Sequence, residues 1–195
     1  MTRAAGTRSA TKLAQAQILR ALETTWRNWR AFIAEKKDEL AQRQADEAGI
    51  IVLAPQSEDA TWDVIVEELG PDVALIDRAL AQVVDQYAVD ATRLAVGGFS
   101  DGASYALSLG LINGDVFSHV IAFSPGFMAL TEQNGAPRVF VSHGVHDSVL
   151  PIDRCSRRLV PLLKQAEYDV RYEEFDGSHT VPPPIADAAR HWFLE

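Results

Sequence analysis

Gly98-Phe99-Ser100-Asp101-Gly102 lies between an apolar run, residues 94–97, and a helix-forming segment, residues 103–111. A chain that passes from a strand to a helix in one tight turn holds the residue at the turn in a strained backbone conformation. The positions two before and two after that residue should therefore be nearly free of side chains, and both are glycine. The stretch predicts a nucleophile elbow with Ser100 at its apex.

Downstream of Gly49, short apolar runs typical of strands buried on both faces alternate with segments of helical periodicity. Strands are expected at residues 50–54, 94–98, 119–123, 138–142 and 170–175, and helices at residues 71–87, 103–111, 151–166 and after Pro184. The last strand is more polar than the others, as expected near a sheet edge, and Pro161 is expected to kink the helix that contains it. This alternation predicts an α/β fold with a mainly parallel sheet.

The first 47 residues differ from the rest and are expected to form a helical N-terminal segment, with the α/β domain spanning residues 48–195. Apolar positions step mostly by three or four between residues 9 and 46, and they include Trp26 and Trp29. One continuous helix would be about 55 Å long, which exceeds the width of a domain of this size. It is expected either to break near residues 24–25 or to pack on a second copy of the chain.

Composition narrows the function classes. The 195 residues carry a net charge of −9, which disfavours nucleic acid as a partner, and a single cysteine, Cys155, fits a reducing compartment. No apolar run reaches membrane-spanning length, and no secretory signal follows Met1, so a cytoplasmic protein is expected. Residues 1–22 are rich in Ala, Thr and Arg and contain no acidic side chain, a composition that also describes a transit peptide.

Three loops at the carboxyl ends of the predicted strands contain the side chains of a nucleophilic hydrolase. Ser100 follows the second strand, Asp147 lies in the loop of residues 143–150, and His179 lies in the loop that follows residue 175. A serine hydroxyl needs an imidazole to take its proton, and the imidazole needs a carboxylate to orient it. The order Ser, Asp, His along the chain is the one used on the α/β-hydrolase sheet. Ser100, Asp147 and His179 are therefore the candidate catalytic residues.

Other residues compete for these roles less well. His143 and His146 with Asp147 suggest only a weak metal site, so neither a metal nor a cofactor is expected. Asp176 stands three residues from His179 and would crowd it as the acid. The backbone N–H of Asp101 follows the nucleophile and is expected to donate to the oxyanion.

From about Ala48 onward the chain resembles the phospholipase/carboxylesterase branch of the α/β-hydrolases, related to polyhydroxybutyrate depolymerase-like esterases. The matching stretches are residues 51–55, 61–63, 98–102, 123–126, 142–144 with Asp147 and Pro151, and 176–179. The resemblance implies hydrolysis of carboxylic esters, with Ser100 as nucleophile, His179 as general base and acid, and Asp147 orienting it. It also suggests that Trp62, Phe127 and Met128 shape an acyl pocket, with ordinary core packing as the alternative for each.

The chain departs from that family in one respect. Members carry, before the region of Ala48, a strand that ends in a Leu-His-Gly type motif and supplies a second oxyanion donor; residues 1–47 contain no His-Gly pair. The alternative to an esterase is therefore a weakened or non-catalytic hydrolase-fold protein whose N-terminal helix mediates assembly or partner binding. The sequence leaves esters, thioesters and peptides open as substrates.

Overall fold

The computed structural model describes residues 49–57, 61–63, 70–129 and 133–195. The described chain divides into two units, residues 49–56 and the residues from 57 onward, and each is described by itself. The helix predicted within residues 9–46 and the domain boundary predicted at residue 47 lie outside the described residues.

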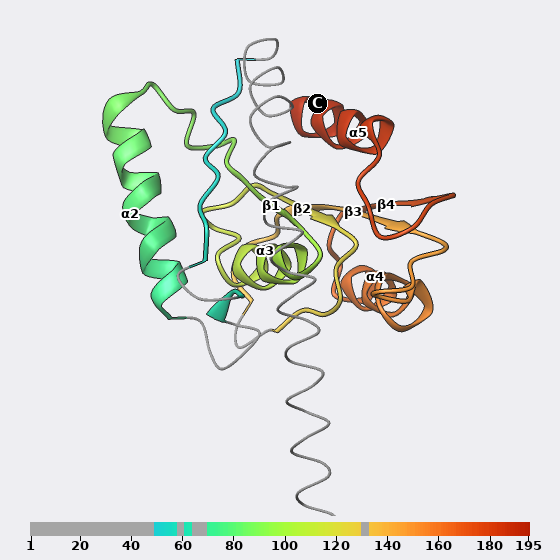
Figure 1. The fold of residues 1–195 in the computed structure, drawn as a ribbon. Coiled ribbons are helices and arrows are strands. Elements are labelled where there is room, and N and C mark those ends of the chain that lie inside the picture. The colour runs from blue at the N-terminus through green and yellow to red at the C-terminus, as the bar shows by residue number, and fades with distance from the viewer. Residues whose placement is uncertain (1–48, 58–60, 64–69, 130–132) are drawn as a thin grey trace, which may run out of the picture. The chain divides into compact units, whose positions relative to one another are not determined.

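The second unit is built on a parallel sheet of four strands in the order β1-β2-β3-β4 (Figure 1). The strands are β1 (Ala95–Phe99), β2 (His119–Phe123), β3 (Arg138–Gly144) and β4 (Val170–Phe175). Each strand pairs in parallel with the next, and β4 lies at an edge, as its polar sequence predicts. The predicted α/β class with a parallel sheet is confirmed.

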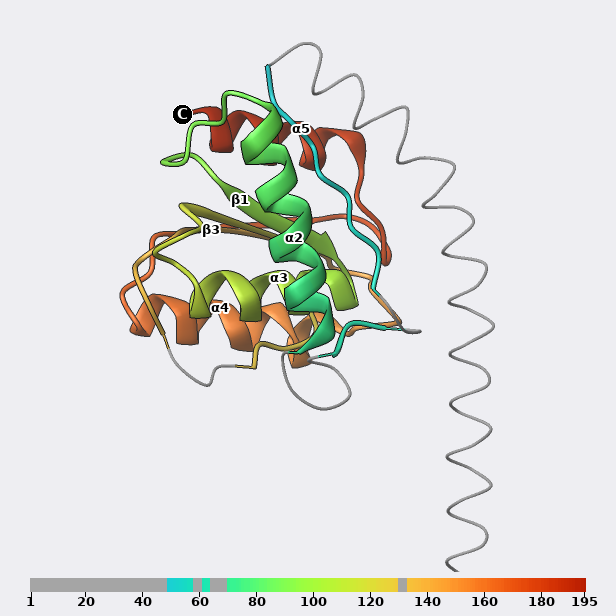
Figure 2. The ribbon, with the colours of Figure 1, turned by 90° about the vertical axis from the view of Figure 1, so that its left-hand side faces the viewer.

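Helices cover both faces of this sheet (Figures 1 and 2). The α-helices are α2 (Pro71–Gln86), α3 (Asp101–Ile112), α4 (Ser156–Gln165) and α5 (Pro183–Leu194). On one face, leucines of α3 and α4 pack against Val120, Val139 and Val141. On the other face, Trp192 of α5 packs against Phe140 of β3. α2 lies against the outer side of α3, where Val73 and Ile76 join the cluster around Tyr105.

One predicted strand is absent. Residues 50–54 form no strand, and Ile51, Val52 and Leu53 are 49%, 48% and 40% exposed. An apolar run becomes a buried strand only where a neighbouring strand supplies partners for its backbone N–H and C=O groups. The expectation that this run would be buried on both faces is therefore wrong for the described structure.

Two further expectations need correction. The helix predicted from Pro151 begins at Ser156, because a short 3₁₀ turn (Ile152–Arg154) comes first and Cys155, with φ −115° and ψ −106°, interrupts the helical backbone. The alternation of strands and helices also lapses between β2 and β3, where the described residues contain no helix.

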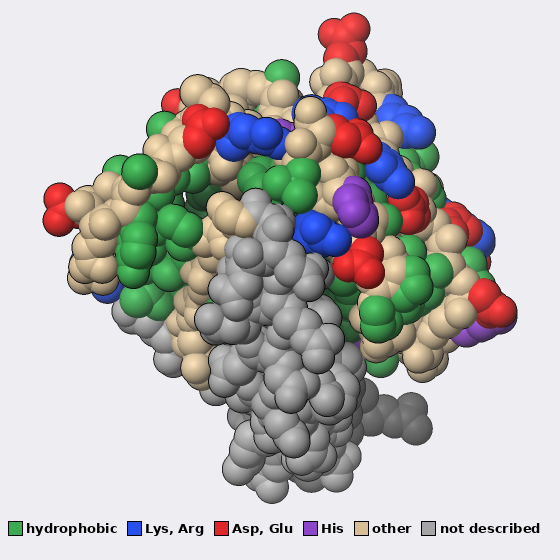
Figure 3. All heavy atoms as spheres, turned by 90° about the horizontal axis from the view of Figure 1, so that it is seen from above, with side chains coloured by type: hydrophobic (Ala, Val, Ile, Leu, Met, Phe, Trp, Pro, Cys, Tyr) green, Lys and Arg blue, Asp and Glu red, His purple; other side chains and the backbone are tan. Residues whose placement is uncertain are grey.

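The surface near α5 mixes charges of both signs (Figure 3). Arg190 lies 3.8 Å from Asp187, and Arg171 lies 2.8 Å from Glu173. No helix within the described ranges combines the length and apolar character needed to cross a bilayer.

Candidate active site

Ser100 occupies the sharp turn between β1 and α3. Its backbone has φ 61° and ψ −120°, a conformation that non-glycine residues rarely adopt. The turn is held in place because the N–H of Ser100 donates to the carbonyl of Phe123, while the carbonyl of Ser100 accepts from the N–H groups of Ala103 and Ser104. The hydroxyl therefore stands at the carboxyl edge of the sheet and at the beginning of a helix.

The two glycines that flank the turn serve unequal purposes. A methyl group on Gly98 would overlap the backbone of Gly102, so this position requires glycine. A methyl group on Gly102 would meet only the indole nitrogen of Trp62, at 3.5 Å, which is an ordinary contact. The expectation that both positions must lack a side chain is therefore correct for Gly98 alone.

His179 links Ser100 to Asp147. Its Nε2 lies 2.9 Å from Oγ of Ser100, and its Nδ1 lies 2.5 Å from Oδ2 of Asp147. Because a carboxylate only accepts, Nδ1 donates to Asp147 and Nε2 is left to accept the hydroxyl proton of Ser100. An imidazole in this arrangement can take a proton from the serine as the hydroxyl attacks.

Asp147 is held firmly in a buried position. Its side chain has no exposed surface, and its Oδ1 accepts hydrogen bonds from the backbone N–H groups of Val149 and Leu150, at 2.9 and 2.8 Å. Its own N–H donates to the carbonyl of Gly144 at the end of β3. A carboxylate fixed by backbone donors keeps one orientation, which in turn fixes the ring of His179.

Close backbone packing brings the loops of Asp147 and His179 together. A methyl group on Gly144 would overlap the carbonyl oxygens of Gly177 and Ser178, and the N–H of His146 donates to the carbonyl of Gly177. The ring of Phe99 lies 4.6 Å from that of His179 and supports its position beside the elbow. Phe99 belongs to the elbow motif, but the motif alone gave no sign of this contact.

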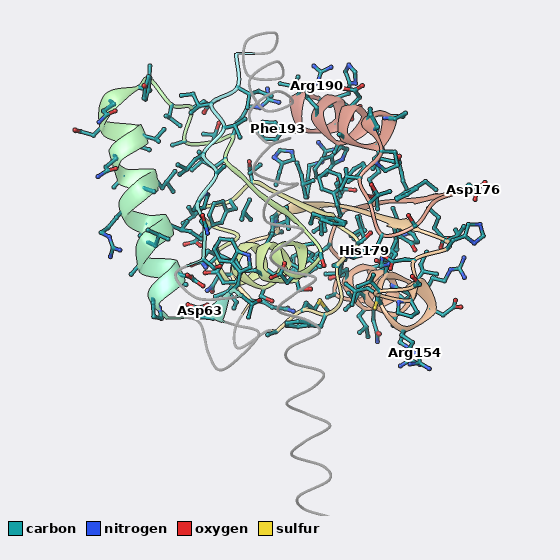
Figure 4. The ribbon with its side chains drawn as sticks, viewed as in Figure 1. Asp63, Arg154, Asp176, His179, Arg190 and Phe193 are labelled. Carbon is teal, nitrogen blue, oxygen red and sulfur yellow. The ribbon has the colours of Figure 1, made fainter. Side chains whose placement is uncertain are left out.

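Asp176 points away from the site. Figure 4 shows Asp176 directed outward beyond β4, while His179 points inward. The carboxylate of Asp176 lies 2.9 Å from Nε2 of His146, and both side chains are largely exposed. Asp176 therefore does not compete with Asp147 for His179.

Asp101 and Thr61 join the elbow to a preceding loop. Oδ1 of Asp101 accepts from the N–H of Gly102 at 2.8 Å, and Oδ2 accepts from the hydroxyl of Thr61 at 2.9 Å. From the sequence, only the backbone N–H of Asp101 was assigned a role, and Thr61 was not identified. Two residues that are 40 positions apart give no sequence signal of such a contact.

The three residues suggested for an acyl pocket have different surroundings. Trp62 stacks on Tyr105 with ring centroids 4.5 Å apart, and Met128 packs against the core cluster beneath α3 and α4. Phe127 is 36% exposed, and its N–H lies 3.4 Å from Oγ of Ser104, one turn along α3 from Ser100. Packing therefore accounts for much of the environment of Trp62 and Met128.

His119, His191 and Cys155 lie outside the contacts that join Ser100, His179 and Asp147. His119 is buried with its ring edge-on to Trp192 and Phe193, and burial lowers its pKa. His191 is exposed on α5. Cys155 is buried, and that burial raises the pKa of its thiol, which suits a packed and unreactive side chain.

Comparison with protein families gives one match that spans most of the chain. The family model described as Phospholipase/Carboxylesterase matches residues 58–192, a range that includes Ser100, Asp147 and His179. Among curated proteins, a probable feruloyl esterase C from Aspergillus flavus is 33% identical over 104 residues, or 53% of this chain and 37% of that protein. A feruloyl esterase C from Emericella nidulans is 32% identical over 104 residues, again 53% of this chain and 37% of that protein. The chain thus spans little more than a third of the curated relatives that it matches.

Solved structures give the same result for the fold. Esterase PE8 is 29% identical with a TM-score of 0.55, and the match covers 62% of this chain and 58% of that one. The Bacillus cereus carboxylesterase is 20% identical with a TM-score of 0.51, covering 61% of this chain and 57% of that one. At that identity the second likeness bears on the fold alone.

Proposed function

Since this chain belongs to the phospholipase/carboxylesterase family of the α/β-hydrolases, we propose that it hydrolyses carboxylic esters through an acyl-enzyme on Ser100. One observation carries the proposal: the imidazole of His179 lies within hydrogen-bonding distance of both the Ser100 hydroxyl and the Asp147 carboxylate. The strained backbone of Ser100 gives further support, because residues with such strained conformations cluster at active sites.

In the proposed reaction, His179 accepts the hydroxyl proton while Oγ of Ser100 attacks the ester carbonyl. The resulting oxyanion accepts a hydrogen bond from the backbone N–H of Asp101, at the start of α3. His179 then donates its proton to the leaving alcohol, and an acyl group remains on Ser100. Water repeats the sequence with His179 as base, which releases the acid and restores the serine. Asp147 stays ionised throughout and stabilises the imidazolium.

Two features of the described structure support an acyl site beside Ser100. Phe127 is partly exposed on the loop after β2, and Oγ of Ser104 accepts from the N–H of Gly126 at 3.0 Å, which ties that loop to the first turn of α3. Trp62 lies next to Gly102. We propose that Phe127 and Trp62 contact the acyl group and that Met128 supports them from the core. The names of the curated relatives make aromatic acyl esters such as methyl ferulate suitable probes beside simple alkyl esters.

A fluorophosphonate label tests the nucleophile directly. The folded wild-type protein should be labelled covalently at Ser100, and Ser100→Ala should lose both the label and ester turnover. Ser148→Ala, an exposed serine in a neighbouring loop, is the matched control and should label normally. If the wild-type protein folds, as judged by circular dichroism, and takes up no label, the proposed chemistry is wrong.

Substrate class requires a separate assay. A panel of p-nitrophenyl esters of increasing chain length, methyl ferulate, a thioester and a peptide would be compared by kcat/KM. We expect esters to be preferred, with turnover rising across about pH 6 to 7.5, where imidazoles lose their proton. A preference for the peptide, or a flat profile across that range, would contradict the proposal.

A further inference from the structure

His143 is buried at the end of β3, and both of its ring nitrogens have partners. Nδ1 lies 2.7 Å from Oγ of Ser156, at the beginning of α4. Nε2 lies 2.8 Å from the carbonyl oxygen of Leu150 and 3.3 Å from Oδ2 of Asp147. The side chain of His143 has no exposed surface. Its contacts thus reach the same carboxylate oxygen that receives Nδ1 of His179.

The partners of His143 determine its tautomer. A backbone carbonyl and a carboxylate only accept, so the proton is on Nε2, and Nδ1 accepts from the hydroxyl of Ser156. Burial lowers the pKa of His143, despite the opposing effects of the Leu150 carbonyl and of Asp147. His143 therefore faces Asp147 as a neutral hydrogen-bond donor.

Neutrality of His143 matters because two imidazoles share one oxygen of Asp147. If His143 carried a positive charge, it would repel the imidazolium that His179 must become during the reaction. Two other titratable groups lie near His143. Glu174 of β4 is the residue paired with His143 in the register of the two strands, and Cys155 directly precedes Ser156. Glu174 is bound by Arg157 at 2.6 Å, so its charge is compensated.

We propose that His143, held as the Nε2–H tautomer by Ser156, is a positioning residue that orients the Asp147 carboxylate and limits how strongly it retains the proton on His179. This inference rests on the proposed esterase function. A donor on Oδ2 withdraws part of the carboxylate's negative charge. Without that donor, the carboxylate would stabilise the imidazolium of His179 more strongly, and the base would stay protonated to higher pH.

The test is the pH profile of kcat/KM for the best ester of the panel. His143→Leu replaces the imidazole with an apolar side chain of similar volume and so removes the donor. We expect its acidic limb to move to higher pH by about half a unit, and its kcat to fall about tenfold with little change in KM, as loss of a hydrogen bond to a charged group predicts. His143→Gln, whose amide can donate from a similar position, should restore most of both.

Two further variants complete the design. His146→Leu makes the same substitution at an exposed histidine in the loop that follows β3 and should leave the acidic limb in place. Ser156→Ala keeps His143 but removes the hydroxyl that polarises it, so the limb should move in the same direction by a smaller amount. Ser156→Ala carries the test if His143→Leu fails to fold.

A folded His143→Leu protein whose acidic limb coincides with that of the wild type would overturn the inference, whatever its kcat. A Gln variant as impaired as the Leu variant would overturn it as well, because a donor would then not be what is needed. These outcomes are separate from failure of the esterase proposal itself, which would already appear as a folded wild-type protein without fluorophosphonate labelling.

Discussion

The strand that leads to Ser100 lies at the edge of the described sheet, whereas the strand that leads to Asp147 lies inside it. β1 pairs with β2 alone among the described strands, and its Ala95 and Gly97 are exposed. β3 pairs with both β2 and β4, and every residue from Val139 to its end is buried. The acid therefore stands on the more firmly packed side of the molecule, whereas His179 follows β4, the half-buried strand at the other edge of the described sheet.

The hydrogen bonds around the site show the same difference. Asp147 accepts two backbone N–H groups on one carboxylate oxygen and two imidazoles on the other. Ser100 has no such buried cluster, and its position depends on the start of α3 and on the loop joined to Asp101 by Thr61. Substitutions on the two sides should consequently have different effects on stability and on catalysis.

The largest contrast is expected between Gly144→Ala and Gly98→Ala. Both methyl groups would overlap backbone atoms. On the buried side, Gly144→Ala should separate the loops of Asp147 and His179, lowering the free energy of unfolding by about 3 kcal/mol and kcat by about 100-fold or more. On the edge side, β1 is paired with only one other described strand, so Gly98→Ala should cost less stability while labelling of Ser100 is still lost.

Thermal unfolding and the rate of fluorophosphonate labelling would measure the two effects. Gly102→Ala is the control for stability, because its methyl group has room and alanine is the better helix former by about 0.5–1 kcal/mol. The comparison would fail if Gly98→Ala destabilised the protein more than Gly144→Ala.

A smaller effect is expected from Thr61→Val, which keeps the shape of the side chain and removes its hydrogen bond to Asp101. Loss of one such bond should cost about 1 kcal/mol, and kcat/KM should fall a few-fold because the elbow is less firmly held. Thr92→Val removes an equivalent bond, from a threonine hydroxyl to Asp90 at 2.7 Å, in an exposed turn away from the site. Equal losses of kcat/KM in the two variants would show that the Thr61 contact does not support the elbow.

Much of the fold could be predicted from local pattern. The bounds expected for β2 and β4 match the structure, and the helix after the elbow was expected within two residues of its start. β4 was predictable because a more polar strand suits the edge of a sheet, and β2 because a strand buried on both faces needs a continuous apolar run. Residues 50–54 have the same pattern, but a strand also needs a hydrogen-bonding neighbour, which no local pattern reports.

For the site, residue types and their order along the chain were sufficient to select Ser100, Asp147 and His179, which the structure brings together. Their catalytic roles remain our proposal. The contact of His143 with Asp147 could not be predicted, because the spacing of His143, His146 and Asp147 also fits a weak metal site. Only the three-dimensional structure shows that the ring nitrogens of His143 are hydrogen-bonded to Ser156 and Leu150.

The variant with the smallest expected effect on ester turnover separates the stability of the sheet from the chemistry at its carboxyl edge. His119 begins β2, at the end of the sheet opposite to Ser100, and burial lowers its pKa. Within the described chain its Nε2 has no hydrogen-bond partner, and its ring packs edge-on against Trp192 and Phe193. In the unfolded chain the same imidazole has its ordinary pKa of about 6.5.

Above that pH neither state binds the proton, and His119 makes no pH-dependent contribution to stability. As the pH falls below about 6.5, the unfolded chain takes up a proton that the folded protein does not, so the free energy of unfolding decreases by up to about 1.4 kcal/mol per pH unit. His143 contributes in the same direction, since burial lowers its pKa too.

His119→Phe should therefore reduce the decrease in the free energy of unfolding between pH 7 and pH 5, as measured by urea unfolding. His191→Phe, on the surface of α5, should not. Because His119 is remote from His179, its replacement should leave the acidic limb of ester turnover where it is; a shift of that limb would mean that the two ends of the sheet are coupled.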